Sequence, residues 1–274
     1  MSMDGKRVLI TGGNSGIGKV TAIELAKLGA EVVLACRESE KTNTALQEIG
    51  AHGEVANLPV DLASLASVRN LAEAFLERYD RLDVLINNAG TFPAKLTLTE
   101  DGFETQFGVN HLAHFLLTNL LLGRLKESAP SRVITVTSKL HKNGAMDFES
   151  FRGEQKYSAQ KAYGQSKLAN VLFAVELAER LAGTGVTSNM LHPGAVRTDI
   201  MREMPRFLRS LINLFFIDVE KGARTSIMLA SDPALATTNG AYFDQCERDD
   251  YADVAKDKGL RERLWSESEA FTAA

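Results

Sequence analysis

Two side chains four residues apart, Tyr163 and Lys167, have the types and the spacing for acid–base chemistry. They lie in a segment with helical periodicity, which places a phenol and an ammonium one turn apart on the same face. A phenol titrates near 10 in water, and a cation within about 4–6 Å lowers this pKa by about 1–3 units. We therefore expect Tyr163 to give and take protons near neutral pH.

A second pair with the same spacing, Tyr157 and Lys161, shows that spacing alone does not identify the acid–base residue. Ser158 and its neighbours have the character of a helix N-terminus, which leaves Tyr157 in the preceding loop. Tyr163 lies inside the periodic segment, so the sequence favours Tyr163 over Tyr157.

A glycine-rich segment, residues 11–18, follows the first apolar strand directly and opens a helix over residues 19–28. Its glycines allow a sharp turn, a close approach to a pyrophosphate and tight packing of helix against strand. The helix N-terminus adds free N–H groups and the positive end of the helix dipole. Strand, turn and helix together predict a dinucleotide site, and the alternative is a purely structural turn.

The end of the second strand, at Cys36 and Arg37, bears on which dinucleotide binds. An acidic residue there would bind the ribose 2′-hydroxyl, whereas an arginine accommodates a 2′-phosphate. Arg37 can bind phosphate through two parallel hydrogen bonds, and Lys19 can add a second positive charge. We expect NADP(H) rather than NAD(H). The alternative is that both cations are solvated and pair with Glu38 or Glu40.

Short β-branched and apolar runs alternate with amphipathic segments along the chain. This alternation predicts a parallel sheet covered by helices on both faces and connected by right-handed crossovers. We expect one doubly wound α/β domain of Rossmann type over residues 1–274. The predicted strands are residues 7–10, 31–35, 55–60, 82–86, 132–136 and 186–191.

Two longer periodic segments predict helices over residues 100–126 and 159–181, and residues 138–157 are expected to form a long loop. The two helices could pack against a second copy of the chain, so a homo-oligomer stays open.

An apolar stretch flanked by arginines, at about residues 198–218, is expected to be an insertion that covers the substrate as a lid. Like residues 92–98 and 138–157, it follows a strand C-terminus, where open α/β sheets place their ligands. These segments suggest a hydrophobic alcohol or carbonyl as substrate, such as a retinoid, a steroid or a lipid aldehyde. The alternatives for the stretch are packing onto the core or a partner subunit, and shallow attachment to a membrane surface.

Composition excludes several other classes. A formal charge of −4 without blocks of like charge gives no general attraction to nucleic acid. Two cysteines, Cys36 and Cys246, are too few for a disulfide framework and fit a reducing compartment. His111 and His114 share a helix face but lack a third ligand, so no metal site is expected. No signal segment and no apolar run of about 18 residues is evident, and the cytoplasm is the expected location.

Motifs in the right order along nearly the whole chain resemble those of the classical short-chain dehydrogenase/reductase family. Within that family the chain resembles the retinol dehydrogenase-like branch, through residues 35–37, the long interval 138–163 and the sequence of residues 163–170. The resemblance implies a mostly parallel sheet of seven strands. The matching residues are Thr11 to Gly18, Asp61, Leu62, Asn87, Asn88, Ala89, Gly90, Asn110, Ser138, Tyr163, Lys167, Pro193, Gly194 and Thr198.

The resemblance implies an NADP(H)-dependent oxidoreductase that moves a hydride between nicotinamide and an alcohol or carbonyl carbon. Ser138 would donate a hydrogen bond to the substrate oxygen, and Tyr163 would exchange a proton with it. Lys167 would bind the nicotinamide ribose, and Asn110 would kink its helix and hold a water that relays protons to Lys167. The expected cofactor contacts are Gly12, Asn14, Ser15, Gly16, Ile17, Gly18, Arg37, Asp61, Leu62, Asn88, Ala89, Gly90, Tyr163, Lys167, Pro193, Gly194, Val196 and Thr198.

Several of these residues also have a structural interpretation. Ser138 can be an ordinary strand-end hydroxyl, Asn110 can cap or kink a helix, and Asp61 can cap the helix that begins near Ser64. A nucleotide-sensing protein with a vestigial active site is the alternative function, and epimerisation or reduction of an activated double bond is a third. The intact serine, tyrosine and lysine favour the oxidoreductase.

Overall fold

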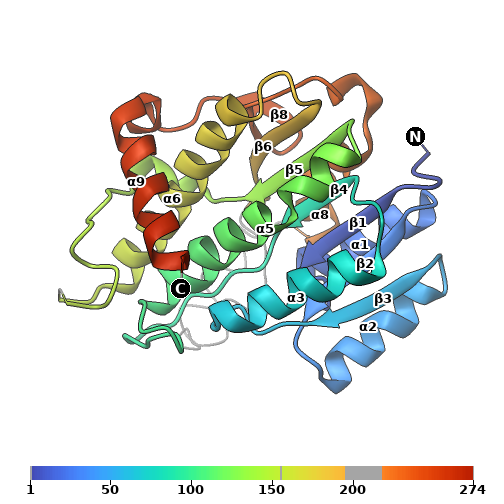
Figure 1. Cartoon of the computed structure of the whole chain (residues 1–274), viewed down its shortest axis with the longest axis horizontal. Coiled ribbons are helices and arrows are strands. Elements are labelled where there is room, and N and C mark those ends of the chain that lie inside the picture. The colour runs from blue at the N-terminus through green and yellow to red at the C-terminus, as the bar shows by residue number, and fades with distance from the viewer. Residues whose placement is uncertain (1, 155, 195–217, 274) are drawn as a thin grey trace.

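One sheet runs through the computed structural model, which describes residues 2–154, 156–194 and 218–273 (Figure 1). The strand order within these residues is β3-β2-β1-β4-β5-β6-β7-β8, and only β7 and β8 pair antiparallel. The strands are β1 Arg7–Thr11, β2 Glu31–Cys36, β3 Val55–Pro59, β4 Val84–Asn87, β5 Ser131–Val136, β6 Val186–His192, β7 Tyr242–Asp244 and β8 Glu247–Asp249.

The doubly wound class and the six predicted strands are confirmed, but the described part of the sheet has eight strands rather than seven. The antiparallel edge strand β8 follows β7 through Gln245 and Cys246, whose φ angles are 48° and 69°. Two-residue hairpin turns with two positive φ angles usually contain Asn-Gly. Because neither residue gives that signal, the sequence did not predict this hairpin.

Helices cover both faces of the sheet (Figure 1). Val8 and Ile10 of β1 share a core with α1, α2 and α8, whereas Leu9 shares a core with α3, α5, α6 and α9. This burial on both faces explains the near-continuous apolar strands. The helices are α1 Gly16–Lys27, α2 Glu40–Gly50, α3 Leu65–Arg78, α4 Thr105–Phe107, α5 Ala113–Glu127, α6 Ala159–Arg180, α8 Val219–Ser231, α9 Lys258–Thr272, the π-helical turn η1 Gly108–Leu112 and the 3-10 turns η2 Lys139–Asn143, η4 Pro233–Leu235 and η5 Asp253–Lys256.

The predicted helix over residues 159–181 is confirmed as α6, but the one over residues 100–126 is wrong at its start. The Glu104 carboxylate accepts hydrogen bonds from the N–H groups of Gln106 and Phe107, both at 2.9 Å. Such a cap satisfies the first N–H groups of a helix, so the helix begins at Thr105. The π-helical turn η1 then separates α4 from α5.

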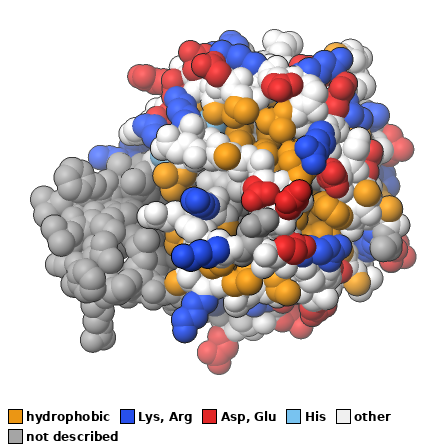
Figure 2. Space-filling view, turned by 90° about the vertical axis from the view of Figure 1, so that its left-hand side faces the viewer, with side chains coloured by type: hydrophobic (Ala, Val, Ile, Leu, Met, Phe, Trp, Pro, Cys, Tyr) orange, Lys and Arg blue, Asp and Glu red, His pale blue; other side chains and the backbone are white. Residues whose placement is uncertain are grey.

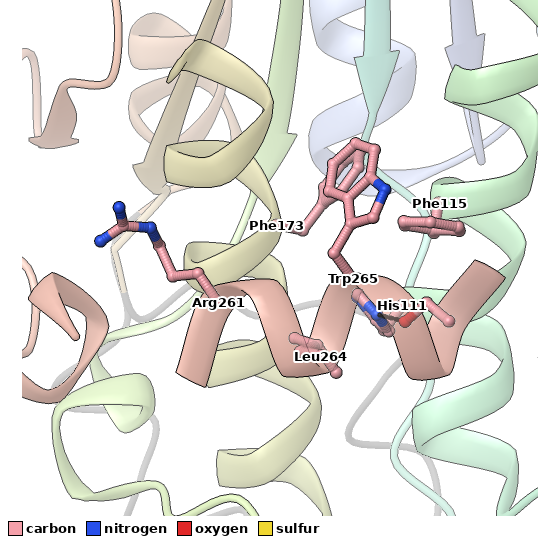
Figure 3. Close-up of a pocket in the computed structure, with 7 residues that line it drawn as sticks. His111, Phe115, Phe173, Arg261, Leu264 and Trp265 are labelled. Carbon is pink, nitrogen blue, oxygen red and sulfur yellow. Dashed lines mark hydrogen bonds between the residues drawn. The ribbon is translucent and has the colours of Figure 1, made fainter. Parts of the chain in front are cut away.

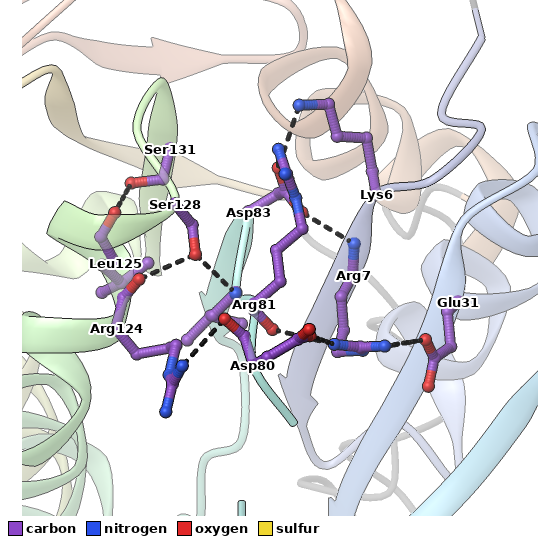
Figure 4. A network of polar contacts seen from close by, with 11 residues as sticks. Lys6, Arg7, Glu31, Asp80, Arg81, Asp83, Arg124, Leu125, Ser128 and Ser131 are labelled. Carbon is purple, nitrogen blue, oxygen red and sulfur yellow. Dashed lines mark hydrogen bonds and ion pairs between the residues drawn. The ribbon is translucent and has the colours of Figure 1, made fainter. Parts of the chain in front are cut away.

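The amino ends of the strands are joined by an ion-pair network around Asp83 (Figure 4). The carboxylate of Asp83, only 2% exposed, accepts hydrogen bonds from Lys6 Nζ at 2.9 Å and from Arg81 Nε at 2.6 Å. It also accepts one from the backbone N–H of Arg7 at 3.0 Å. This network lies at the edge of the sheet opposite to the carboxyl ends of the strands, where ligands bind in such folds.

The stretch expected to form a lid, at about residues 198–218, lies outside the described residues except for Asp218. Among the helices that the structure does describe, none is long and apolar enough to cross a membrane.

Candidate active site

The segment predicted to bind the dinucleotide, residues 11–18, connects β1 to α1, and we call it the glycine turn. Gly12 has a φ of 66°, and a Cβ atom on it would lie 3.1 Å from the Cα of Ala89. A Cβ on Gly18 would lie 2.5 Å from the carbonyl oxygen of Gly12. Glycine is therefore required at both positions by backbone conformation and close packing.

The N-terminus of α1 fits a phosphate. Ser15 occupies the N-cap position, but its side chain makes no capping hydrogen bond to the first N–H groups of α1. Free N–H groups and the helix dipole favour an anion there. Gly16 has a φ of 51°, and the Ile17 side chain is buried against Ala223 of α8.

Arg37 is tied to the glycine turn through Thr42. The Thr42 hydroxyl accepts a hydrogen bond from Asn14 Nδ2 at 2.9 Å and donates one to the carbonyl oxygen of Arg37 at 2.6 Å. The Arg37 side chain is exposed, and it makes no ion pair with any described residue. Lys19, by contrast, pairs with Glu48 at 2.6 Å, so the expected alternative partners Glu38 and Glu40 are wrong for this lysine.

Cys36 stands where an acid would select NAD(H). Burial raises the pKa of the Cys36 thiol to about 11, although N–H groups of the glycine turn, including Asn14 and Gly13, favour the thiolate. The thiol is therefore neutral at pH 7 and presents no negative charge to repel a 2′-phosphate.

Asp61 and Leu62 follow β3 as predicted, but the helix N-cap is Ser64 rather than Asp61. Ser64 Oγ accepts a hydrogen bond from the N–H of Ser67, at the start of α3. The Asp61 carboxylate accepts one from the N–H of Ala63 at 3.0 Å, and Leu62 packs against the core.

The turn after β4, residues 87–90, contacts the glycine turn directly. Asn88 Nδ2 donates to the carbonyl oxygen of Thr11 at 2.8 Å, and the N–H groups of Asn88 and Ala89 donate to the Thr11 hydroxyl. A Cβ on Gly90 would lie 3.5 Å from Lys167 Nζ. Three parts of the predicted site therefore meet at the carboxyl edge of the sheet.

Ser138, Tyr163 and Lys167 come together where α6 passes the end of β5. Lys167 Nζ lies 5.5 Å from the centre of the Tyr163 ring and donates a hydrogen bond to the carbonyl oxygen of Val136 at 3.2 Å. Burial raises the pKa of Tyr163 to about 12, and a hydrogen bond with Ser138 offsets only part of this rise. Burial also lowers the pKa of Lys167 to about 8.

These pKa values correct the expectation that Lys167 lowers the tyrosine pKa by 1–3 units. In the protein alone, desolvation dominates both groups, because it penalises the phenolate and the ammonium alike. The four-residue spacing indicates that the two side chains lie close together, but it does not show how strongly the surrounding protein desolvates them.

The second pair, Tyr157 and Lys161, has different surroundings. Tyr157 lies before the N-cap Ser158, and its hydroxyl donates to the carbonyl oxygen of Pro93 at 2.8 Å and accepts from Gln106 Nε2 at 2.9 Å. Lys161 is exposed on α6. Of the two pairs, only that of Tyr163 and Lys167 lies with Ser138.

Asn110 lies in the π-helical turn η1 and is fully buried. Its side-chain oxygen accepts from the N–H of Thr91 at 2.7 Å, and its Nδ2 donates to the Thr91 carbonyl and to Ser166 Oγ, at 3.1 and 3.0 Å. Both amide hydrogens and one lone pair of the side-chain oxygen thus join the segment after Gly90 to α6. The predicted kink corresponds to η1.

The turn after β6 begins at Pro193 and Gly194, and Gly194 has a φ of 88°. Val196 and Thr198, the other residues expected there, lie outside the described residues.

Two residues at the site, Phe92 and Thr11, were assigned no individual role from the sequence. Phe92 packs edge-on against the Tyr163 ring, with centroids 5.1 Å apart, and Thr11 provides the hydroxyl that accepts the N–H groups of Asn88 and Ala89. Thr11 carries a usable signal, since a hydroxyl that ends an apolar strand beside glycines can satisfy exposed backbone groups.

A small hollow between η1, α5, α6 and α9 does not belong to this site (Figure 3). His111, Phe115 and Trp265 are among the residues that line it, and it has no room for a water molecule. The hollow is therefore a packing gap rather than a ligand site.

Comparison with known proteins identifies the family. Residues 6–208 match the short chain dehydrogenase family. The chain is 48% identical to retinol dehydrogenase 14 of Mus musculus over 286 residues, covering 97% of this chain and 86% of the relative. It is 45% identical to retinol dehydrogenase 12 of Homo sapiens over 273 residues, covering 98% of this chain and 86% of the relative.

Solved structures show the same relationship. A protein from Mycobacterium paratuberculosis has a TM-score of 0.83 at 36% identity, and the match covers 100% of this chain and 95% of that one. The NADP complex of RhlG from Pseudomonas aeruginosa has a TM-score of 0.72 at 32% identity, covering 89% and 95%. The chain is an oxidoreductase acting on CH–OH and C=O groups, and it belongs to the short-chain dehydrogenase family.

Proposed function

We propose that this oxidoreductase uses NADP(H) to interconvert a hydrophobic alcohol and its carbonyl compound, with Tyr163 as the acid–base. The observation that carries the proposal is the convergence of Ser138, Tyr163 and Lys167 at the edge of the sheet where the glycine turn lies.

The residues present fit a dinucleotide phosphate. The uncapped N–H groups of α1 would hold the pyrophosphate, and the exposed guanidinium of Arg37 would bind a 2′-phosphate. The neutral Cys36 thiol leaves that position open to an anion. The NADP in the Pseudomonas complex supports the same choice. Lys167 would bind the nicotinamide ribose, and the remaining contacts would come from the residues named from the family resemblance.

The chain's own residues handle the proton and the substrate oxygen. A bound nicotinamide supplies or accepts the hydride. In reduction, the Tyr163 hydroxyl gives its proton to the substrate oxygen, and in oxidation the phenolate removes the proton from the alcohol. The Ser138 hydroxyl donates a hydrogen bond to the same oxygen as charge develops on it. A phenol with a raised pKa is protonated at pH 7, which suits the direction of reduction.

An aromatic side chain beside Tyr163 and exposed apolar side chains in two nearby loops support a hydrophobic substrate. Phe92 forms one wall beside the phenol, and the side chains of Leu96 and Leu140 are 40% and 45% exposed in the loops expected to set specificity. The two loops touch, because a Cβ on Gly153 would lie 2.9 Å from Leu96. Figure 2 shows one face of the molecule, on which exposed apolar side chains lie between charged ones, and this face is not used to assign the site. The names of the retinol dehydrogenase relatives agree with this class of substrate.

The test follows NADPH absorbance with aldehydes and ketones graded by chain length and ring size, with NADH in parallel. We expect turnover that rises with the apolar size of the substrate and is faster with NADPH. Tight NADPH binding without turnover on any carbonyl compound would contradict the proposal and favour a nucleotide sensor.

A further inference from the structure

A buried histidine, His114, lies between the glycine turn and Asn110. Its Nε2 is 2.8 Å from Thr11 Oγ1, and its Nδ1 is 3.0 Å from the carbonyl oxygen of Asn110. The histidine is 1% exposed, and Thr11 and Asn110 are fully buried. None of the roles proposed above involves this imidazole.

The hydrogen bonds of the Thr11 hydroxyl determine whether Nε2 of the His114 ring carries a hydrogen. The hydroxyl accepts two N–H groups, from Asn88 at 2.9 Å and Ala89 at 3.0 Å, so both lone pairs are used. Its single hydrogen goes to His114 Nε2 at 2.8 Å rather than to the carbonyl oxygen of Ile86 at 3.4 Å. Nε2 is therefore an acceptor without a hydrogen.

The other ring nitrogen must then carry the hydrogen. A neutral imidazole has one donor and one acceptor nitrogen, so Nδ1–H donates to the carbonyl oxygen of Asn110. Desolvation lowers the pKa of His114 to about 4, which agrees with a neutral ring at pH 7.

The hydrogen bonds continue from Asn110 to the helix that carries the acid–base. Asn110 Nδ2 donates to Ser166 Oγ at 3.0 Å, and Ser166 Oγ donates to the carbonyl oxygen of Tyr163 at 2.9 Å. Buried polar contacts thus link the glycine turn to α6 through His114 and through both the backbone and the side chain of Asn110.

We propose that His114, as the neutral Nδ1–H tautomer, is a positioning residue that holds the glycine turn and Asn110 in register with Tyr163. This inference depends on the proposed function, because it assigns His114 the alignment of the proposed cofactor site with the proposed acid–base. Misplacement of about 1 Å between reacting groups costs on the order of a hundredfold in rate, so loss of this alignment has a measurable effect.

The first test is the tautomer. Nitrogen NMR of the protein labelled with ¹⁵N-histidine, assigned by comparison with His114→Gln, reports which ring nitrogen carries a hydrogen. We expect a protonated Nδ1 and a bare Nε2 at pH 7, with and without NADPH. An Nε2–H tautomer or an imidazolium would overturn the inference, and this readout does not depend on turnover.

The second test compares His114→Leu with the matched variant His111→Leu. His111 is equally buried, but its Nε2 contacts Ser268 of α9 at 3.0 Å and not the site. We expect His114→Leu to lower kcat by about tenfold or more relative to His111→Leu and to weaken NADPH binding. His114→Gln, which keeps an acceptor for Thr11, is expected to recover most of that loss. Equal kcat in the two leucine variants would overturn the inference.

A double-mutant cycle separates positioning from general destabilisation. Thr11→Val removes the hydroxyl that donates to His114, so we expect Thr11→Val/His114→Leu to be no slower than the worse single variant. Multiplicative effects on kcat would overturn the inference. Absence of turnover in the wild-type protein would contradict the proposed function instead, and the tautomer and NADPH affinity would still test His114.

Discussion

The ammonium of Lys167 lies 5.5 Å from the centre of the Tyr163 ring, and Lys167 is buried whereas Tyr163 is partly exposed. Desolvation raises the pKa of the phenol to about 12 and lowers that of the ammonium to about 8. Each group is therefore pushed toward its neutral form until a ligand supplies compensating polar contacts.

This relationship predicts a pH dependence of cofactor binding. Charged Lys167 would bind the ribose hydroxyls, and it loses its proton above its pKa of about 8. The dissociation constant of NADPH, measured by fluorescence titration, is expected to change little between pH 6.5 and 7.5 and to rise as the pH passes through about 8. In Lys167→Met the rise should disappear. An unchanged inflection in that variant would mean that another group controls it.

Arg37 is expected to select NADPH over NADH. Arg37→Asp replaces a phosphate-binding cation by an anion, so NADPH should bind about 10- to 100-fold more weakly while NADH binding changes little. Arg248→Asp provides the control, since Arg248 is also exposed but lies on the distant strand β8. Equal weakening of both cofactors by Arg37→Asp would remove the argument for a 2′-phosphate site.

Buried histidines make stability depend on pH. Desolvation lowers the pKa of His111 to about 3 and those of His114 and His192 to about 4, and it also lowers that of His141. Between these values and the unfolded value near 6.5, the unfolded chain binds more protons, so stability is retained above about pH 6.5 and lost below it.

We therefore expect the free energy of unfolding in urea to fall between pH 7 and pH 5.5, by about 1 kcal/mol for each of His111, His114 and His192. In His111→Phe the free energy of unfolding should fall by about 1 kcal/mol less over the same pH interval. A free energy of unfolding that stays constant over this interval would show that the histidines are not buried as described.

The network around Asp83 is expected to stabilise the fold without affecting the chemistry. Asp83→Ala removes the acceptor of the Arg7 backbone N–H and of two partly exposed cations, Lys6 and Arg81, and should cost about 1–3 kcal/mol of unfolding free energy. Asp80→Ala is the control, because Asp80 is 93% exposed and its ion pair with Arg7 should contribute little. Equal losses in urea denaturation would contradict the assignment. The NADPH affinity of folded Asp83→Ala should stay close to that of the wild type.

Local sequence patterns predicted the first six strands and the helix that carries Tyr163. Apolar runs gave β1 to β6, and helical periodicity placed Tyr163 inside α6 and Tyr157 before it. The break before Thr105 was missed, because the capping carboxylate of Glu104 lies within an otherwise periodic segment. Hydrophobic periodicity does not register a cap of this kind.

Other features of the site could not be predicted from local sequence patterns, because they depend on contacts between residues that are distant in the chain. Thr11 and His114 are 103 residues apart in the chain, and their hydrogen bond exists only in the folded protein. The raised pKa of Tyr163 depends on burial by surrounding elements, which spacing does not reveal. The cytoplasmic location, the homo-oligomer and the individual cofactor contacts stay predictions.

The central claim is that Tyr163, and not Tyr157, exchanges the proton with the substrate. The most direct measurement is kcat with NADPH and a reactive aldehyde for Tyr163→Phe and Tyr157→Phe, with NADPH affinity measured for both. The account predicts a loss of about a thousandfold or more in Tyr163→Phe, with NADPH affinity nearly intact, and a small change in Tyr157→Phe. Near-normal turnover in Tyr163→Phe would contradict it.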